Sequence, residues 1–279
     1  MKKVLLASTA LIVTAGYAAA DVTLSGSANF GVNYDESRTT DEVRLTYEVD
    51  FGISGSGTTD GGLSFGASVD LDAGIDSDTG DAVGTLVSDP EVFISGAFGT
   101  LTVGDVSVAT DPFGISDVGF NGIGIDDGAD SLLVQGSANV LYQYTFGQFA
   151  VDVSFHTINE DYSVIGVYST SMFDIGVGYA EDDDGSDAIT VNGSVNIAGL
   201  NIGGVFTDAS GGLESYGADV TWSDGGALSV TAAVGDVDGQ DVAFGVGASY
   251  DLGGGASLGA GIGSANDNVV ADFGINLSF

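Results

Sequence analysis

The sequence has few of the residues that usually carry chemistry. Its 279 residues include no cysteine, one histidine (His156), two prolines, and four lysines and arginines against 40 aspartates and glutamates. The absence of cysteine excludes disulfide frameworks, thiolate nucleophiles and cysteine-ligated metals. The formal charge of −36 argues against a nucleic-acid partner, because neutralising phosphates needs lysine and arginine.

The sequence contains no pattern typical of an active site. The single histidine is not accompanied by a nucleophile motif, and the 46 glycines do not form a phosphate-binding or dinucleotide-binding loop. The paired acids Asp70 and Asp72 have the residue type of a glycosidase pair, but acids are too frequent here for the pairing to be informative. We therefore expect that the protein is not an enzyme and requires no cofactor.

Residues 1–20 have the pattern of a secretory signal peptide. Lys2 and Lys3 precede a mostly apolar stretch, and three alanines at 18–20 form a small-residue cleavage site. The apolar run is shorter than the roughly 20 residues that a membrane-spanning helix needs. No later segment is long and apolar enough either. We expect residues 1–20 to be removed and residues 21–279 to form one domain, which can cross a membrane only with strands.

Apolar and polar residues alternate with period 2 through most of the chain, and this pattern is typical of half-buried strands. In the last segment, Val269, Ala271 and Phe273 share one face while Asn268 and Asp272 lie on the other. The predicted strands are 21–35, 41–55, 62–73, 90–98, 100–108, 138–146, 148–157, 162–170, 172–181, 187–198, 200–208, 214–222, 227–236, 241–252, 255–264 and 267–279.

The connections between these sixteen segments alternate between two kinds. Tight turns such as 147–148 and 253–255 contain glycine, which supplies the positive φ that they need. The other connections are longer and acidic, and 105–137 is the longest. This alternation predicts an up-and-down meander, with both termini on the side of the tight turns.

Of the 40 acids, 28 fall in or at the long connections. The eight that remain within the strands, away from their ends and from the tight turns, all fall on the polar face, so the apolar face is expected to carry no charge. Such a segregation fits a β-sandwich, with the apolar face inside, or a transmembrane β-barrel, with the apolar face toward lipid. The eight acids are Glu48, Asp50, Asp70, Asp72, Asp152, Asp174, Asp219 and Asp272.

Three features favour the barrel. Aromatic residues gather beside the tight turns, as in an interfacial girdle. Many segments run about 9–11 residues, which is enough to span a bilayer when tilted. The last residue, Phe279, ends an alternating strand, and we expect it to serve as an assembly signal. The aromatic residues near the tight turns are Phe98, Phe146, Phe149, Phe173, Trp222, Tyr250 and Phe279.

Several blocks of the sequence resemble the general porins of alphaproteobacteria. These blocks are 21–32, 57–68, 92–105, 245–257 and the closing strand to Phe279. The resemblance implies a homotrimer of sixteen-stranded barrels in the outer membrane of a Gram-negative bacterium, through which small hydrophilic solutes diffuse passively. It also implies that the third loop, about 105–137, folds into the pore.

The resemblance further implies a constriction in which acids on the loop face basic residues on the wall. This sequence departs from that pattern, because the wall can offer Arg44, while Arg38 lies in the first loop. Arg44 is expected to pair with Glu42 or Glu48, either as a local ion pair or as a charge that tunes the pore. The candidate pore-lining residues are Asp105, Asp111, Asp117, Asp126, Asp127, Asp130, Arg44, Glu42, Glu48, Asp70, Asp72 and Asp152.

A lumen lined with carboxylates has a negative potential, which low-dielectric walls focus, and acidic rings favour cations. We therefore predict a cation-preferring channel. A barrel that does not conduct and a secreted acidic Ca²⁺-binding β-protein or adhesin are the alternatives.

The acidic outer connections have three interpretations. They form a solvated surface suited to a salty medium, bind Ca²⁺ through oxygen ligands, or join lipopolysaccharide phosphates through divalent ions. The expected partners are further copies of the chain, outer-membrane lipid and lipopolysaccharide, and the barrel assembly machinery. The candidate Ca²⁺ ligands are Asp182, Asp183, Asp184, Asp187, Asp236, Asp238 and Asp241.

Overall fold

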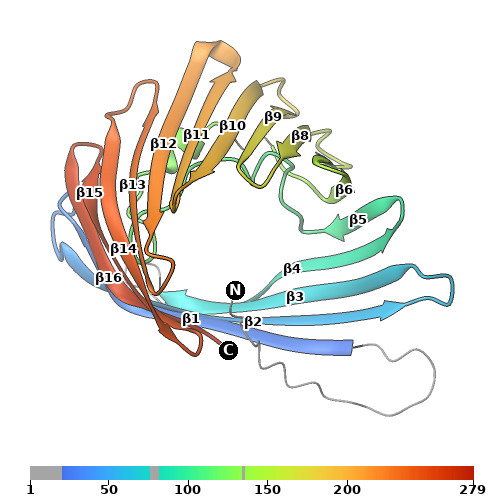
Figure 1. Cartoon of the computed structure of the whole chain (residues 1–279), viewed down its shortest axis with the longest axis horizontal. Coiled ribbons are helices and arrows are strands. Elements are labelled where there is room, and N and C mark those ends of the chain that lie inside the picture. The colour runs from blue at the N-terminus through green and yellow to red at the C-terminus, as the bar shows by residue number, and fades with distance from the viewer. Residues whose placement is uncertain (1–20, 76–81, 134–135) are drawn as a thin grey trace.

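A computed structural model describes residues 21–75, 82–133 and 136–279. Sixteen antiparallel strands close into a barrel in which every strand pairs with its neighbours in sequence and β1 pairs with β16 (Figure 1). This closed ring confirms the predicted barrel and excludes the sandwich. The predicted signal peptide, residues 1–20, lies outside the described residues.

The strand bounds agree closely with the alternating segments. The strands are β1 (Asp21–Asp35), β2 (Val43–Thr58), β3 (Ser64–Ile75), β4 (Ala82–Gly96), β5 (Gly99–Gly104), β6 (Val140–Phe146), β7 (Phe149–Phe155), β8 (Tyr162–Ser169), β9 (Phe173–Glu181), β10 (Asp187–Ile197), β11 (Leu200–Ala209), β12 (Leu213–Ser223), β13 (Leu228–Val237), β14 (Ala243–Gly253), β15 (Ala256–Ala265) and β16 (Asn268–Ser278). Two short helices, α1 (Asp127–Asp130) and η1 (Ser210–Gly212), lie in connections.

The fourth and fifth strands differ from their predicted bounds of 90–98 and 100–108. β4 begins at Ala82. The sequence pattern does not predict the first part of this strand, because two register shifts against β3 interrupt the period-2 alternation. Asp89, with φ of 49°, and Pro90 lie at one of these irregularities. β5 ends at Gly104, where a φ of 141° turns the chain away from the sheet.

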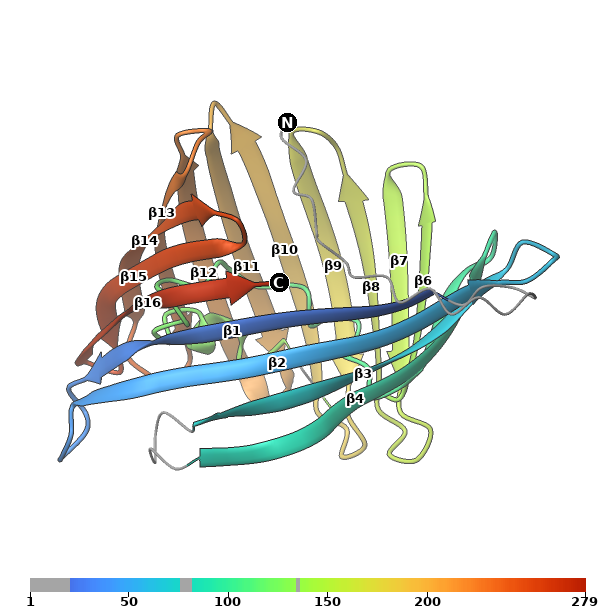
Figure 2. The ribbon, with the colours of Figure 1, turned by 90° about the horizontal axis from the view of Figure 1, so that it is seen from below.

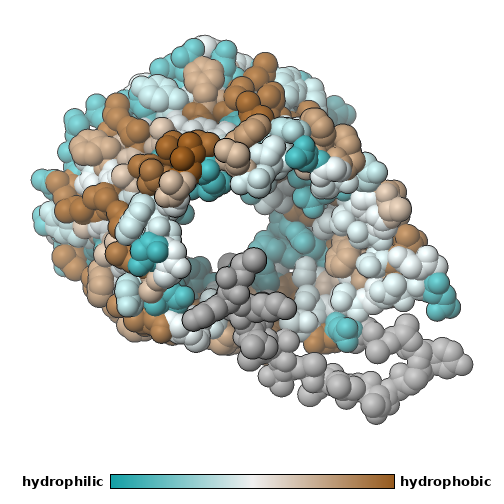
Figure 3. All heavy atoms as spheres, viewed as in Figure 1, coloured by the Kyte–Doolittle hydropathy of each residue, from teal (hydrophilic) through white to brown (hydrophobic). Residues whose placement is uncertain are grey.

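The two faces of the strands differ as the alternation predicts. On β9, Phe173, Ile175 and Val177 are exposed on the outer face, whereas Gly176 and Gly178 are buried on the lumen face. The space-filling view shows hydrophobic residues distributed over the outside of the ring and an opening through its centre (Figure 3). Large apolar side chains are therefore exposed on the outer face of the strands.

The prediction that the outer face carries no charge is wrong at the ends of the strands near the long connections. Glu181 on β9 pairs with Asp187 on β10, and both share the parity of the outer apolar residues. Asp208 pairs with Glu214 in the same way, and Asp236 accepts a hydrogen bond from the hydroxyl of Tyr216 at 2.6 Å. The strands extend beyond their apolar stretches, so the last residues of this face are acidic.

The predicted aromatic girdle is present at the end with the tight turns. The rings of Phe146 and Phe149 stack with centroids 5.6 Å apart, Phe149 lies 4.8 Å from Tyr168, and Tyr168 lies 6.0 Å from Phe173. Because amphipathic and aromatic rings are favoured at the membrane–water boundary, this row marks one interface. Within the described ranges, no helix is long and apolar enough to cross a membrane.

The strands are unequal in length around the barrel. β1–β4 contain 12 to 16 residues, whereas β5–β8 contain 6 to 8. Figure 2 shows the long strands running obliquely across the barrel while β6–β12 stand closer to upright. The short stretch of wall begins where the long connection after β5 leaves it.

Candidate pore constriction

The described residues of the connection between β5 and β6, 105–133 and 136–139, lie inside the barrel, and we call this connection the constriction loop. Figure 1 shows it within the ring, with α1 beside β11–β13. Of the nineteen buried apolar residues in the described chain, eleven belong to this loop, among them Val118 and Ile125 at 0% exposure. The hydrophobic core of the protein therefore surrounds the loop, because the apolar faces of the strands point outward.

Two buried carboxylates of the wall hold the constriction loop. Asp272 on β16 accepts the backbone N–H groups of Phe120 and Asn121, both at 2.8 Å. Asp219 on β12 accepts the hydroxyl of Ser116 at 2.8 Å. Charge-assisted hydrogen bonds of this kind are stronger than neutral ones, so these residues fix the path of the loop.

Asp161, just before β8, holds the far end of the loop. Its Oδ2 atom accepts the backbone N–H of Ser137 at 2.7 Å and the Ser137 hydroxyl at 2.9 Å, while Oδ1 accepts the N–H of Asp183 at 3.0 Å. These hydrogen bonds lower the pKa of Asp161 below its ordinary value, although burial acts in the opposite direction. The carboxylate thus stays charged and joins the loop to the β9–β10 connection.

Glycines on the lumen face make room for the aromatic residues of the loop. A Cβ atom on Gly274 would lie 2.5 Å from the ring of Phe120, and one on Gly31 would lie 2.7 Å from it. On the opposite side, a Cβ on Gly176 would lie 2.6 Å from the ring of Phe113. The wall is therefore hollowed where the loop packs, and larger residues there would push the loop into the passage.

The predicted loop acids separate into two groups. Asp117, Asp126 and Asp130 come together within the loop, where the charge of Asp117 raises the pKa of both other carboxyl groups. The Oδ1 atoms of Asp126 and Asp130 are buried and accept no hydrogen bond from the described residues. Asp117 is the exposed member of this cluster, and Asp111 and Asp127 are exposed as well. The loop is thus held from outside by the wall but contains mutually repelling carboxylates.

The environment of Asp126 and Asp130 favours their protonated forms. Burial is the largest cause for both groups. The charge of Asp126 comes next for Asp130, and the charges of Asp117 and Asp127 act in the same direction on both groups. Together they raise the pKa of Asp130 from 3.8 to about 7, against a lowering contribution from the backbone N–H of Ile115. The pKa of Asp126 is raised in the same way.

The wall of β2 and β3 is acidic as well. Glu48, Asp50, Asp70 and Asp72 line a cavity of about 440 Å³ together with Ser25 and Ser27. Neighbouring hydroxyl and amide groups donate hydrogen bonds to some of these carboxylates. For example, the Ser27 hydroxyl donates to Asp50 at 3.0 Å. The structure therefore brings predicted residues Glu48, Asp70 and Asp72 together on one surface.

This acidic wall continues toward the start of the constriction loop. Asp105 lies with Asp70, Asp89 and Glu91 around a second cavity of about 430 Å³. Asp152, on the lumen side of β7, accepts the amide of Gln143 at 3.1 Å. Carboxylates thus occupy both the loop and the wall.

Two basic residues belong to the described part of the chain, Arg38 and Arg44, and they lie on or near β1 and β2. Arg38 forms an ion pair with Asp35, with Nε and Oδ2 3.8 Å apart, and donates to Asn33 Oδ1 at 2.6 Å. Arg44 lies on the lumen face of β2, opposite Asn33 in the register. Glu42 precedes β2 and is exposed. Pairing of Arg44 with Glu42 or Glu48 stays a prediction.

The acidic outer connections use several of their carboxylates to hold the backbone. Asp182 Oδ1 accepts the N–H groups of Asp184 and Ser186 at 3.2 and 3.0 Å, and Asp238 accepts the N–H of Glu214 at 3.1 Å. Among the described residues, no group of three or more histidines, cysteines or acids is arranged to hold a metal ion. Calcium binding there stays a prediction.

A sixteen-stranded antiparallel barrel that encloses a long inward loop is the architecture of a porin. The chain belongs to the Gram-negative porin family, whose family model matches residues 7–269.

Individual relatives agree with this assignment. A porin of Rhodobacter capsulatus is 30% identical over 190 residues, which cover 61% of this chain and 59% of that porin, so the match spans about three fifths of the relative. A solved mutant of the Rh. blastica porin superposes with a TM-score of 0.79 at 22% identity, covering 92% of this chain and all of that chain. A triple mutant of the Rhodopseudomonas blastica porin gives 0.78 at 21%, with the same coverage. These structures show the fold.

Proposed function

We propose that the protein forms a water-filled channel in the outer membrane through which small hydrophilic solutes and ions diffuse passively, with a preference for cations. The observation that carries this proposal is the placement of carboxylates on both sides of the lumen. Asp117 and Asp127 lie on the constriction loop, and Glu48 and Asp72 lie on the wall of β2 and β3.

The preference for cations follows from the sign of the field. A constriction with acids on one side and bases on the other would have a transverse field, whereas acids on both sides give a negative potential throughout. Low-dielectric walls focus such a potential and raise the local concentration of cations. Arg44 reduces this potential locally on β2, and the neighbouring acids outnumber it.

The environment and assembly of the channel belong to the same proposal. The apolar outer face and the aromatic row suit a bilayer, a signal peptide over residues 1–20 would export the chain, and family membership supports a homotrimer. Phe279 is proposed as the residue that the barrel assembly machinery reads. Lipopolysaccharide is the proposed neighbour of the acidic outer rim.

Conductance of the purified protein in a planar bilayer tests this function. In a KCl gradient, we expect current steps in multiples of three and a reversal potential of the sign that cation flow produces. An anion-selective channel would still be a porin but would contradict the proposed preference for cations. A folded, heat-modifiable sample that never conducts would leave a structural barrel as the function.

A further inference from the structure

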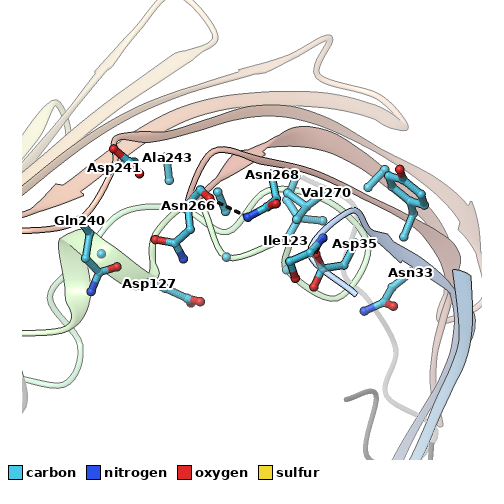
Figure 4. A pocket seen from close by; sticks show the side chains of 18 of the residues that line it. Asn33, Asp35, Ile123, Asp127, Gln240, Asp241, Ala243, Asn266, Asn268 and Val270 are labelled. Carbon is cyan, nitrogen blue, oxygen red and sulfur yellow. Dashed lines mark hydrogen bonds between the residues drawn. The ribbon is translucent and has the colours of Figure 1, made fainter. Parts of the chain in front are cut away.

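A pocket of about 460 Å³ lies at the mouth of the barrel that carries the long connections, and we call it the vestibule pocket. Its wall combines the constriction loop with the ends of β1, β13, β14 and β16. Figure 4 shows Asp127, Gln240 and Asp241 at one end and Asn33 and Asp35 at the other. The volume is in the range of small-molecule sites.

The two ends of the vestibule pocket differ in whether their carboxylates have hydrogen-bond or ion-pair partners. At the β1 end, the carboxylate of Asp35 is paired with Arg38 and accepts the N–H of Ser37 at 2.8 Å. At the other end, Asp127 and Asp241 have no side-chain hydrogen bond or ion pair within the described ranges. This end therefore offers hydrogen-bond acceptors and negative charge to a ligand.

The middle of the pocket is apolar on one side. Ile123 of the constriction loop is 8% exposed, and it lies with Val270 between the two ends (Figure 4). Asn268 donates its amide to the backbone carbonyl of Asn266 at 2.6 Å, which fixes the amide beside this surface. A ligand that spans the pocket would thus meet carboxylates first and an apolar surface next.

We propose that the vestibule pocket binds aliphatic primary ammonium solutes, with the ammonium group at the end of the pocket that Asp127 and Asp241 line. The alkyl chain lies over Ile123 and Val270. The inference rests on the proposed channel, because it names a class of solute that would pause in the pore before passing the constriction loop.

Other classes of ligand fit this chemistry less well. An anion would be repelled by the negative charges of Asp127 and Asp241. A neutral polyol could donate only uncharged hydrogen bonds to the two carboxylates, and these are weaker than the hydrogen bonds that a charged donor makes. A bare divalent cation requires six to eight converging oxygens, and no such group exists among the described residues. An ammonium group supplies three donors and one positive charge.

Saturation-transfer difference NMR on the folded, detergent-solubilised protein tests the proposal without requiring conduction. The probes are 4-aminobutan-1-ol and 1,4-butanediol, which match in length and differ in the ammonium group. We expect saturable binding of the amine, weaker in high KCl, and no saturable binding of the diol. Binding of both probes with equal strength would overturn the proposal.

Two charge-matched variants locate the site. Asp127→Asn with Asp241→Asn removes the acceptor charges of the pocket, whereas Asp60→Asn with Asp224→Asn removes two charges at tight turns on the opposite end. The half-saturating concentration of 4-aminobutan-1-ol should rise about tenfold or more in the pocket variant and stay unchanged in the control. Equal affinity in the two variants would mean that the amine binds elsewhere in the lumen.

Conductance measured on the same preparations separates this inference from the proposed function. A channel that conducts KCl but binds no amine would refute the amine site in the vestibule pocket and support the proposed channel. A protein that binds the amine but does not conduct would support the amine site and refute the proposed channel. Heat-modifiable gel mobility checks folding, and Asp241→Asn alone replaces the double variant if that variant fails to fold.

Discussion

The carboxylate of Asp272 on the last strand accepts the backbone N–H of Phe120 at 2.8 Å, across 152 positions of sequence. It accepts the N–H of Asn121 at the same distance and is 6% exposed. The seam at which β16 closes the barrel on β1 is therefore also one of the places where the constriction loop is attached.

Replacing Asp272 with asparagine should loosen this attachment. The variant Asp272→Asn substitutes a neutral amide for a charged acceptor of two backbone donors, and leaving such donors poorly satisfied costs about 1–3 kcal/mol. We expect larger current fluctuations in the open channel, measured by single-channel recording. Asp60→Asn, at an exposed turn, is the control for the lost charge. Fluctuations equal to those of the control would refute the role of Asp272.

Gly274 should not tolerate a side chain while Phe120 is present. A Cβ atom there would lie 2.5 to 2.6 Å from three atoms of the Phe120 ring, whereas a Cβ on Gly55 would meet no atom within 4 Å. We expect Gly274→Ala to lower the temperature at which heat-modifiable mobility is lost, by overpacking of about 1–3 kcal/mol. Gly55→Ala should have little effect.

A second substitution tests whether the Phe120 ring is the cause. Adding Phe120→Ala to Gly274→Ala removes the clashing ring, so the double variant should recover stability relative to the sum of the two single changes. Strictly additive losses would show that Gly274 is needed for another reason, such as backbone geometry within β16.

The positions of the strands could be predicted from the sequence because period-2 alternation is a local property. The alternation predicts β1 at 21–35, the range that the structure shows, and the constriction loop differs from its predicted range by two residues at one end. The alternation predicts no strand over 82–89, although β4 covers these residues, because bulges against β3 shift the pattern. Local pattern succeeds where the pairing is regular and fails where a strand changes register.

The way the wall holds the loop could not be predicted in the same manner. Asp219 and Asp272 were assigned to the lumen face, but their hydrogen-bond partners depend on the path of a loop without periodicity. Gly31 and Gly274 gave no separate signal among 46 glycines. A weak signal did exist, because lumen-face glycines recur across β14, β15 and β16, where the loop packs.

The docking of the constriction loop should weaken as pH rises. The pKa of Asp130 is raised from 3.8 to about 7, so the docked loop binds protons that a released loop does not bind between these values. Linkage then requires that docking is most favourable below pH 3.8 and is lost progressively up to about pH 7. We expect current fluctuations to increase as the pH rises from about 4 to about 7 in single-channel recordings.

Neutral replacements of the two carboxylates should remove this dependence. In the variant with Asp126→Asn and Asp130→Asn, the remaining neighbours Asp117 and Asp127 no longer face a titrating group within the loop. We expect similar, low fluctuations at both pH values. A pH response as large as that of the unmodified protein would place its origin elsewhere in the lumen.

The acidic wall of β2 and β3 should control ion selectivity. Asp50 and Asp72 are direct partners in the register, so Asp50→Asn with Asp72→Asn removes two neighbouring charges from the lumen. The reversal potential in a KCl gradient should move toward zero, and the shift should be larger at low salt because screening is weaker. Asp60→Asn with Asp224→Asn, at the tight turns, serves as the control and should retain the original potential.

Phe279 should influence assembly of the barrel. Its backbone exchanges hydrogen bonds with Gly26 at 2.9 Å in each direction, and its ring packs edge-on against Phe51 with centroids 5.8 Å apart. Removing the ring in Phe279→Ala would leave the backbone pairing intact, so a loss would report the role of the ring. We expect less heat-modifiable protein in outer-membrane fractions. Phe98→Ala, which removes another exposed ring near a tight turn, separates the two possible causes: an equal loss in both variants would assign the effect to the aromatic girdle instead of the terminal residue.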